Sequence, residues 1–168
     1  LSCAVIAQEG EEMQRDYWYD SGRLPGELAD PAAIGRKAAE RTLARLHGRQ
    51  LGTRECPVLF RADVAPSLLR SLFGAIRGHA VYRKSTFLLD RVGTQIFPDW
   101  TQISEDPLRP RGQASAPFDN EGVATGHRDL VKDGVLQGYL LDSYSARKLG
   151  LHSTASAGGV RNGAIASS

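Results

Sequence analysis

Two polar clusters in this 168-residue chain carry side chains that could do chemistry. The first is Arg83-Lys84-Ser85, whose cationic groups could hold a carboxylate or a peptide carbonyl, because Arg donates a bidentate fork. The second is the loop that contains Asp119 and Glu121, and paired acids can do acid–base work. Acids in a tight loop more often accept backbone N–H groups or pair with Arg. The simpler expectation is therefore an ion pair between this loop and Arg83 or Lys84.

No other pattern in the sequence predicts a catalytic centre. No two histidines have the spacing of a helical zinc pair, and no G-x-S-x-G elbow or phosphate-binding glycine loop is present. Cys56 has no histidine nearby in sequence that could activate it. The histidines are interpreted as surface or structural residues: His47, His79, His127 and His152.

Composition narrows the class of protein. The formal net charge is only +2 and the charges are mixed along the chain, so no basic face for nucleic acid is expected. No run approaches the roughly 18 apolar residues of a membrane helix. Cys3 and Cys56 are predicted to be buried thiols in a reducing, cytoplasmic environment, with a disulfide or a metal pair as the alternative.

The pattern along the chain predicts an α+β fold. One helix is expected to begin at Asp30-Pro31, and a second helix, over residues 63–78, carries the small residues Gly74 and Ala75, where another group could approach closely. Asp133-Gly134 predicts a tight hairpin turn between two strands, and Ser143 is expected to cap a short helix that follows it. Further strands are expected over residues 2–8, 13–23, 57–60, 85–90 and 99–104.

Several stretches, spread in order over nearly the whole chain, resemble the PmbA family. This family is also called TldE and is the partner of TldD in a heteromeric metalloprotease system. The stretches that carry the resemblance are "MQRDYWY", "YRKSTFLLD", "PDW", "EDP", "APFDNEGV", "KDGVLQGYLLDSYSARKLGL" and "STASAGG".

The resemblance also implies an architecture. The chain is expected to be a central fragment of a PmbA/TldD-like protein, with two helices and a curved antiparallel sheet. Residues 1–62 would close a mixed N-terminal region, and residues 63–168 would form the start and middle of a β-rich C-terminal domain.

The sister TldD subunit is the informative comparison. TldD-type chains carry H-E-x-x-x-H on the helix before the "RK" loop, and a Cys further along completes their zinc site. Aligned on Arg83-Lys84, the two histidine positions fall on Arg70 and Ala75 here, and the glutamate position falls on Ser71. A guanidinium cannot ligate a metal, and Ala has no donor atom. The resemblance therefore implies no catalytic residue and no metal on this helix, with zinc in a TldD-like partner.

The implied function is that of a non-catalytic subunit of a TldD/TldE-type zinc metalloprotease. Such a protease processes or degrades unfolded peptides, as in microcin maturation. Its expected partners are a TldD-like subunit and an unfolded peptide, with a homodimer as another assembly and with no nucleic acid or membrane. Five residues are expected to contact substrate or partner: Arg83, Lys84, Ser85, Asp119 and Glu121. Two alternatives stay open, a protein-binding regulator of the DNA gyrase modulator type and an active metallopeptidase with ligands elsewhere.

Overall fold

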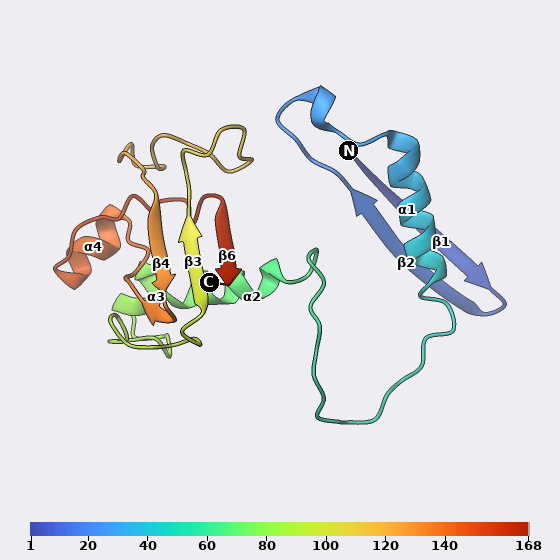
Figure 1. Cartoon of the computed structure of the whole chain (residues 1–168), viewed down its shortest axis with the longest axis horizontal. Coiled ribbons are helices and arrows are strands. Elements are labelled where there is room, and N and C mark those ends of the chain that lie inside the picture. The colour runs from blue at the N-terminus through green and yellow to red at the C-terminus, as the bar shows by residue number, and fades with distance from the viewer. Residues whose placement is uncertain (168) are drawn as a thin grey trace. The chain divides into compact units, whose positions relative to one another are not determined.

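A computed structural model describes residues 1–167 and divides the chain into two compact units, Leu1–Val58 and Leu59–Ser168. Each unit combines helices with an antiparallel sheet, which confirms the predicted α+β class (Figure 1). Within the described residues no helix has both the length and the apolar character needed to cross a membrane.

The first unit is a β-hairpin covered on one face by a helix. Strands β1 (Ser2–Glu9) and β2 (Glu12–Tyr19) pair antiparallel, and a short 3-10 helix η1 (Pro25–Glu27) leads to α1 (Pro31–Leu43). Asp30 caps α1 as predicted, because its carboxylate accepts the first free backbone N–H groups of the helix. Every fourth residue of one helix face is buried: Ile34, Ala38 and Thr42.

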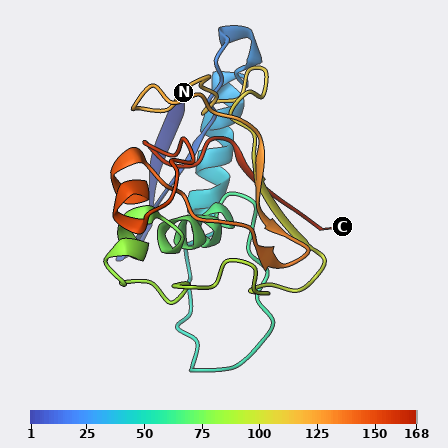
Figure 2. The ribbon, with the colours of Figure 1, turned by 90° about the vertical axis from the view of Figure 1, so that its left-hand side faces the viewer.

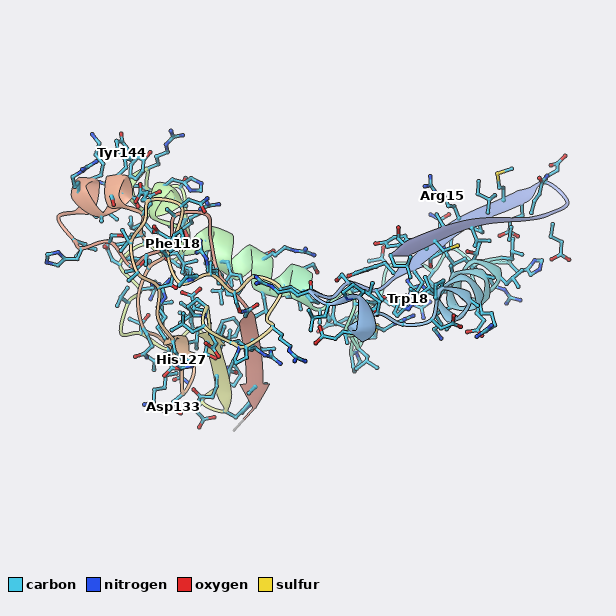
Figure 3. The ribbon with its side chains drawn as sticks, turned by 90° about the horizontal axis from the view of Figure 1, so that it is seen from above. Arg15, Trp18, Phe118, His127, Asp133 and Tyr144 are labelled. Carbon is cyan, nitrogen blue, oxygen red and sulfur yellow. The ribbon has the colours of Figure 1, made fainter. Side chains whose placement is uncertain are left out.

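The covered face of this hairpin carries a partly buried ion pair. Arg41 of α1 lies 3.2 Å from the Asp16 carboxylate and stacks 5.0 Å from the ring centroid of Trp18. The backbone N–H of Tyr17, followed by Arg41, lowers the pKa of Asp16 although burial opposes this. Strand alternation places Trp18 toward α1 and Arg15 on the other face (Figure 3).

The second unit is a four-stranded antiparallel sheet in the order β5-β4-β3-β6. Its strands are β3 (Thr101–Glu105), β4 (Arg128–Lys132), β5 (Val135–Leu136) and β6 (Gly163–Ser167). Its helices are α2 (Pro66–Ala75), α3 (Gly78–Tyr82) and α4 (Ser143–Leu149), and they gather on one side of the sheet (Figure 2).

The core of the second unit lies between α2 and the sheet. Leu72 and Ile76 pack into one cluster with Ile103 of β3 and with Leu130 and Val131 of β4. A short parallel bridge then fixes the end of α2, since the Leu140 N–H donates to the Ile76 carbonyl at 2.9 Å and the Gly78 N–H donates to the Leu140 carbonyl at 2.8 Å. The helix is thereby held in position both by apolar burial and by main-chain hydrogen bonds.

The predicted hairpin turn at Asp133-Gly134 is confirmed. Both residues have positive φ angles, 50° and 75°, as a tight two-residue turn of this type requires. Gly134 also contacts the preceding loop, because its carbonyl accepts from the N–H groups of Ile96 and Phe97. A Cβ atom here would collide with the carbonyl oxygens of Phe97 and Pro98, so the position needs glycine for two reasons.

Some sequence predictions were wrong. Residues 57–60 form no strand, since no neighbouring strand pairs with them and Leu59 is 93% exposed. Residues 85–90 form turns, in which only Leu88 is buried, and the sequence pattern missed both α3 and β6.

Cys56 is exposed although it was predicted to be buried, and both cysteines are free thiols. The cap of α4 is Asp142, because its carboxylate accepts the N–H of Ser145.

We expect Gly134→Ala to lower the free energy of unfolding by at least about 1–2 kcal/mol, because an L-residue pays for the left-handed conformation and its Cβ also meets backbone. Urea unfolding monitored by circular dichroism measures the change. Gly126→Ala is the matched control, because a Cβ there meets nothing within 4 Å and the φ angle is not in the left-handed region. Equal stability of the two variants would contradict the assigned role of Gly134.

Candidate functional site

Helix α2 carries the three residues that the resemblance aligned with a TldD-type zinc motif, and the two positions expected for histidine, Arg70 and Ala75, do not share a face. Arg70 and Ser71 are exposed, whereas Ala75 is half-buried and packs against the core. The Ser71 hydroxyl donates to the Ser67 carbonyl at 3.2 Å, within the same helix. In a regular α-helix, residues five apart point about 140° away from each other. Arg70 and Ala75 therefore point in different directions.

The donor set on α2 does not fit a metal ion. Arg70 is a permanent cation, Ser71 is a weak ligand, and Ala75 has no donor atom. Two ligands five residues apart also need the wider π-type turn to converge, and α2 is an α-helix over its whole length. Within residues 1–167, moreover, no three His, Cys, Asp or Glu side chains are grouped to hold a metal.

A cleft of about 550 Å³ lies beside α2 on the Arg70 face. Arg70 and Gly74 are one helical turn apart on this face, and Arg77 follows just after the helix. The opposite wall comes from the segment before and into β6, with Gly158, Gly159, Val160 and Gly163. Pro66, Leu69, Phe73 and Leu140 complete the lining.

The two cations of this cleft, Arg70 and Arg77, differ in how far an acidic group balances them. Neither Arg70 nor Arg77 forms an ion pair with another residue in the part of the chain that the structure describes. Arg77 does act on Asp142, whose pKa is lowered first by hydrogen bonds from Ser145 and to a lesser extent by Arg77 and His79. Arg70 is thus a cation available to a ligand, and Arg77 is partly balanced.

The other side of α2 borders an apolar groove of about 580 Å³. Ser71 lies on this side with Leu68, and Phe87 and Ile165 face it from other elements. The helix therefore presents one mixed cationic surface and one apolar surface, and the substituted motif is divided between them.

The predicted cluster Arg83-Lys84-Ser85 forms the turn that ends α3. Arg83 donates from Nε to the Tyr82 hydroxyl at 3.3 Å, and this contact is the main cause of the raised pKa of Arg83. Lys84 is exposed with a positive φ of 55°, and Ser85 donates its hydroxyl to the Ala80 carbonyl at 3.3 Å. Tyr82 meets Tyr144 of α4 edge-on, with 5.8 Å between ring centroids. Tyr144 itself lies on α4 (Figure 3).

Asp119 is a structural anchor rather than an exposed contact residue. Its side chain is buried, with 2% of the residue exposed, and its carboxylate accepts backbone N–H groups from Glu121, Val123 and Ala157 at 2.9–3.0 Å. Burial raises its pKa, but these donors outweigh burial and the net pKa is lowered. An enclosed carboxylate with a lowered pKa stays ionised near neutral pH, so it can neither exchange protons there nor reach a substrate.

The expected ion pair between this loop and the Arg83-Lys84 turn does not form. Glu121 instead accepts the Ser143 N–H at 2.8 Å, at the beginning of α4, where a negative charge is favoured by the helix dipole. Neither acid of the loop pairs with Arg83 or Lys84 in residues 1–167. The two predicted clusters are connected only through α4, which contacts Glu121 at Ser143 and Tyr82 at Tyr144.

Sequence reasoning missed Arg77 and the Gly158-Gly159 pair as parts of the site. Two features of the sequence could have indicated them. Arg77 stands near the end of the predicted helix that contains Gly74, and two consecutive glycines stand in "SAGGV". Both glycines have positive φ angles, 96° and 100°. The prediction that Gly74 leaves room for close approach agrees with the open space around it, since a Cβ there would meet no neighbouring atom within 4 Å.

The second unit is thus a helix-and-sheet domain whose helix α2 borders a cleft. Residues 53–167 match the family model of the PmbA/TldA metallopeptidase C-terminal domain, and residues 1–46 match that of the PmbA/TldA metallopeptidase central domain. The chain belongs to the PmbA/TldA metallopeptidase family.

Relatives agree with this assignment. Metalloprotease PmbA of Escherichia coli O157:H7 is 54% identical over 166 residues, which are 99% of this chain and 37% of the relative. A solved structure from Bacteroides thetaiotaomicron, named as a candidate modulator of DNA gyrase, matches with a TM-score of 0.91 at 28% identity and covers 99% of this chain and 38% of that one. TldE of Thermococcus kodakarensis shares the fold, with a TM-score of 0.74 at 22% identity, over 99% of this chain and 38% of its own. The chain thus spans little more than a third of the relatives' length.

We expect the combined variant Arg70→His, Ser71→Glu and Ala75→His to bind no stoichiometric zinc. The two histidines would leave a regular helix about 140° apart, and the second histidine would point toward the core. Metal analysis after dialysis against zinc, followed by a chelator competition, measures the content. The single variant Arg70→His is the control. One tightly held zinc per chain in the combined variant would show that α2 can adopt the wider turn.

We expect Asp119→Asn to destabilise the protein by about 1–3 kcal/mol at neutral pH, because a charged acceptor of backbone N–H groups is lost. The folded pKa of Asp119 lies below its unfolded value, so its contribution is present above the unfolded pKa of about 3.9 and is lost as pH falls through the folded pKa. The stability difference from the unmodified protein should stay constant from neutral pH to about pH 5 and narrow below about pH 4.

Urea unfolding at several pH values tests this pH dependence, with the exposed Asp99→Asn as the control. If the stability difference between Asp119→Asn and the unmodified protein did not narrow below about pH 4, the lost stability would come from packing and not from charge.

Proposed function

We propose that this chain is part of the metal-free supporting subunit of a TldD/TldE-type heteromeric zinc metalloprotease. The complex would act in the cytoplasm on unfolded peptides, including peptides that are processed as in microcin maturation. The zinc and the activated water would come from a TldD-like partner, and this subunit would supply the wall of the peptide-binding chamber.

One observation carries the proposal, namely the chemistry and direction of the residues on α2. By the resemblance, Arg70 and Ala75 take the positions of the TldD-type histidines and Ser71 that of the glutamate, and neither Arg70 nor Ala75 can ligate a metal. Their helix nevertheless borders a cleft of a size that suits a peptide segment, about 550 Å³. A helix that borders a cleft but has no metal ligands is what we expect in a subunit that binds or encloses the substrate without cleaving it.

The remaining predicted contact residues have different places in the proposal. Arg83 and Lys84 are exposed on the turn after α3, where they can meet a partner subunit or a peptide. Ser85 and Glu121 have hydrogen bonds within the fold, and Asp119 holds its loop in place. We therefore assign contact with the partner or substrate to Arg83 and Lys84, and a supporting role to the others.

A second function has one specific observation in its favour, namely the likeness to a solved structure that is named as a candidate modulator of DNA gyrase. A regulator of this kind would bind another protein through its surface, and the small net charge does not favour direct DNA binding. Purification of the tagged protein from its own cells separates the two proposals. Recovery with a TldD-like chain supports the protease subunit, whereas recovery with gyrase and without that chain supports the regulator.

We expect the purified protein alone to leave an unfolded peptide such as reduced, unfolded casein intact, and to support its cleavage when it is mixed with a TldD-like subunit. A chelator should abolish the cleavage, and added zinc should restore it, because the metal is held by the partner. Peptide release followed by mass spectrometry measures the rate. A mixture whose TldD-like subunit lacks its motif glutamate is the control. Cleavage by this protein alone would mean that it has its own catalytic centre.

A further inference from the structure

We propose that the cleft beside α2 binds a peptide segment through a carboxylate, with Arg70 as the principal cation and Arg77 as the second. This inference deepens the proposed function by naming the substrate chemistry that this subunit selects, and it rests on that function for its role in proteolysis. The binding itself requires only the residues of the second unit, Leu59–Ser168.

The charge of the cleft calls for an anion. Its lining contains two guanidinium groups and no acidic residue. Arg70 has no ion-pair partner among residues 1–167, and a guanidinium matches a carboxylate with two parallel hydrogen bonds. Because the chain as a whole has a net charge of only +2, this cleft does not belong to a broad basic surface of the kind that binds nucleic acid.

The other wall of the cleft contains backbone N–H groups that have no acceptor within the described part of the chain. Gly158 and Val160 both line the cleft, and their N–H groups donate no hydrogen bond in the described part of the chain. A Cβ on Gly159 would meet nothing within 4 Å, so a ligand can approach the main chain closely there, whereas the Asn120 side chain covers the corresponding position of Gly158. Free backbone N–H groups bind peptide carbonyls without regard to sequence.

Apolar side chains in the lining favour a peptide over a small inorganic anion. Phe73, Leu140 and Val160 line the cleft between the cationic and the glycine walls. A bare phosphate or sulfate would gain nothing from this apolar surface. A segment with an acidic group beside an apolar residue would use the guanidinium groups, the backbone donors and the apolar lining together.

Gly74 gives the proposal a sharp test. It lies inside α2 and at the cleft, and a Cβ there meets no neighbouring atom within 4 Å. Gly74→Leu should fill the cleft without harming the helix, since Leu has a much higher helix propensity than Gly. Gly35→Leu is the matched control, because Gly35 lies inside α1 of the other unit and a Cβ there is equally unobstructed.

The probe is a short fluorescent peptide of apolar residues around a central glutamate, amidated at its C-terminus. A second peptide replaces the glutamate by glutamine, and a third carries glutamine and a free C-terminus, so that a side-chain carboxylate and a terminal carboxylate are distinguished. Fluorescence anisotropy with the purified protein, in the presence of a chelator, measures affinity without hydrolysis.

We expect at least one carboxylate-bearing peptide to bind about tenfold or more tightly than the neutral one. Arg70→Gln should remove that difference, and Gly74→Leu should abolish binding. Arg49 is an exposed arginine of the first unit, so Arg49→Gln is the matched control for Arg70→Gln. Arg49→Gln and Gly35→Leu should change neither the affinity nor the difference between the peptides. Equal binding of all three peptides, no measurable binding, or unchanged binding by Gly74→Leu would each overturn the inference. Because these measurements need no partner and no metal, they can fail while the subunit still supports cleavage, and they can succeed even if the protein alone proves active.

Discussion

The burial of Leu72 and Ile76 against the sheet is the constraint on which the candidate site depends. Each is a large apolar side chain whose complete burial contributes about 1.5–3 kcal/mol, and both point to the same core from one helix face. Once that face is fixed, the rest of α2 has no rotational freedom. Arg70 must face the cleft, Ser71 must face the apolar groove, and Ala75 must lie against the core. The chemistry of the helix therefore follows from its packing.

The wall opposite α2 is held by a network of buried charge. Glu105 is 5% exposed, and its carboxylate accepts from the Arg128 side chain and from the Arg161 N–H. Arg128 also donates to the Ser156 hydroxyl, and Asp119 accepts the Ala157 N–H. Removing one partner of such a buried pair typically costs about 3–5 kcal/mol, because the other charge is left unpaired. These contacts fix the residues on both sides of Gly158-Gly159, so that the glycines meet the cleft from a rigid frame.

A helix that has no metal ligands and still borders a cleft is consistent with a division of work between two related subunits. Hydrolysis requires a metal-activated water, which this helix cannot provide, whereas orientation of a peptide requires only cations, backbone donors and apolar surface. Under the alignment that the resemblance implies, Arg70 takes the place of a histidine, and a guanidinium attracts an anion where an imidazole would hold a metal cation.

The sequence by itself determined the α+β class, the cap of α1 at Asp30 and the turn at Asp133-Gly134, because these depend on local backbone preferences. Through the resemblance it also gave the prediction that Arg70, Ser71 and Ala75 take the positions of a TldD-type zinc motif. Tertiary structure decided the rest. A strand such as β6 exists only where β3 offers a partner, and residues 57–60, which have a similar apolar pattern, find none. The cleft joins Arg70 to Gly158, far apart in sequence, and no local pattern encodes a contact whose energy comes from the packing between them.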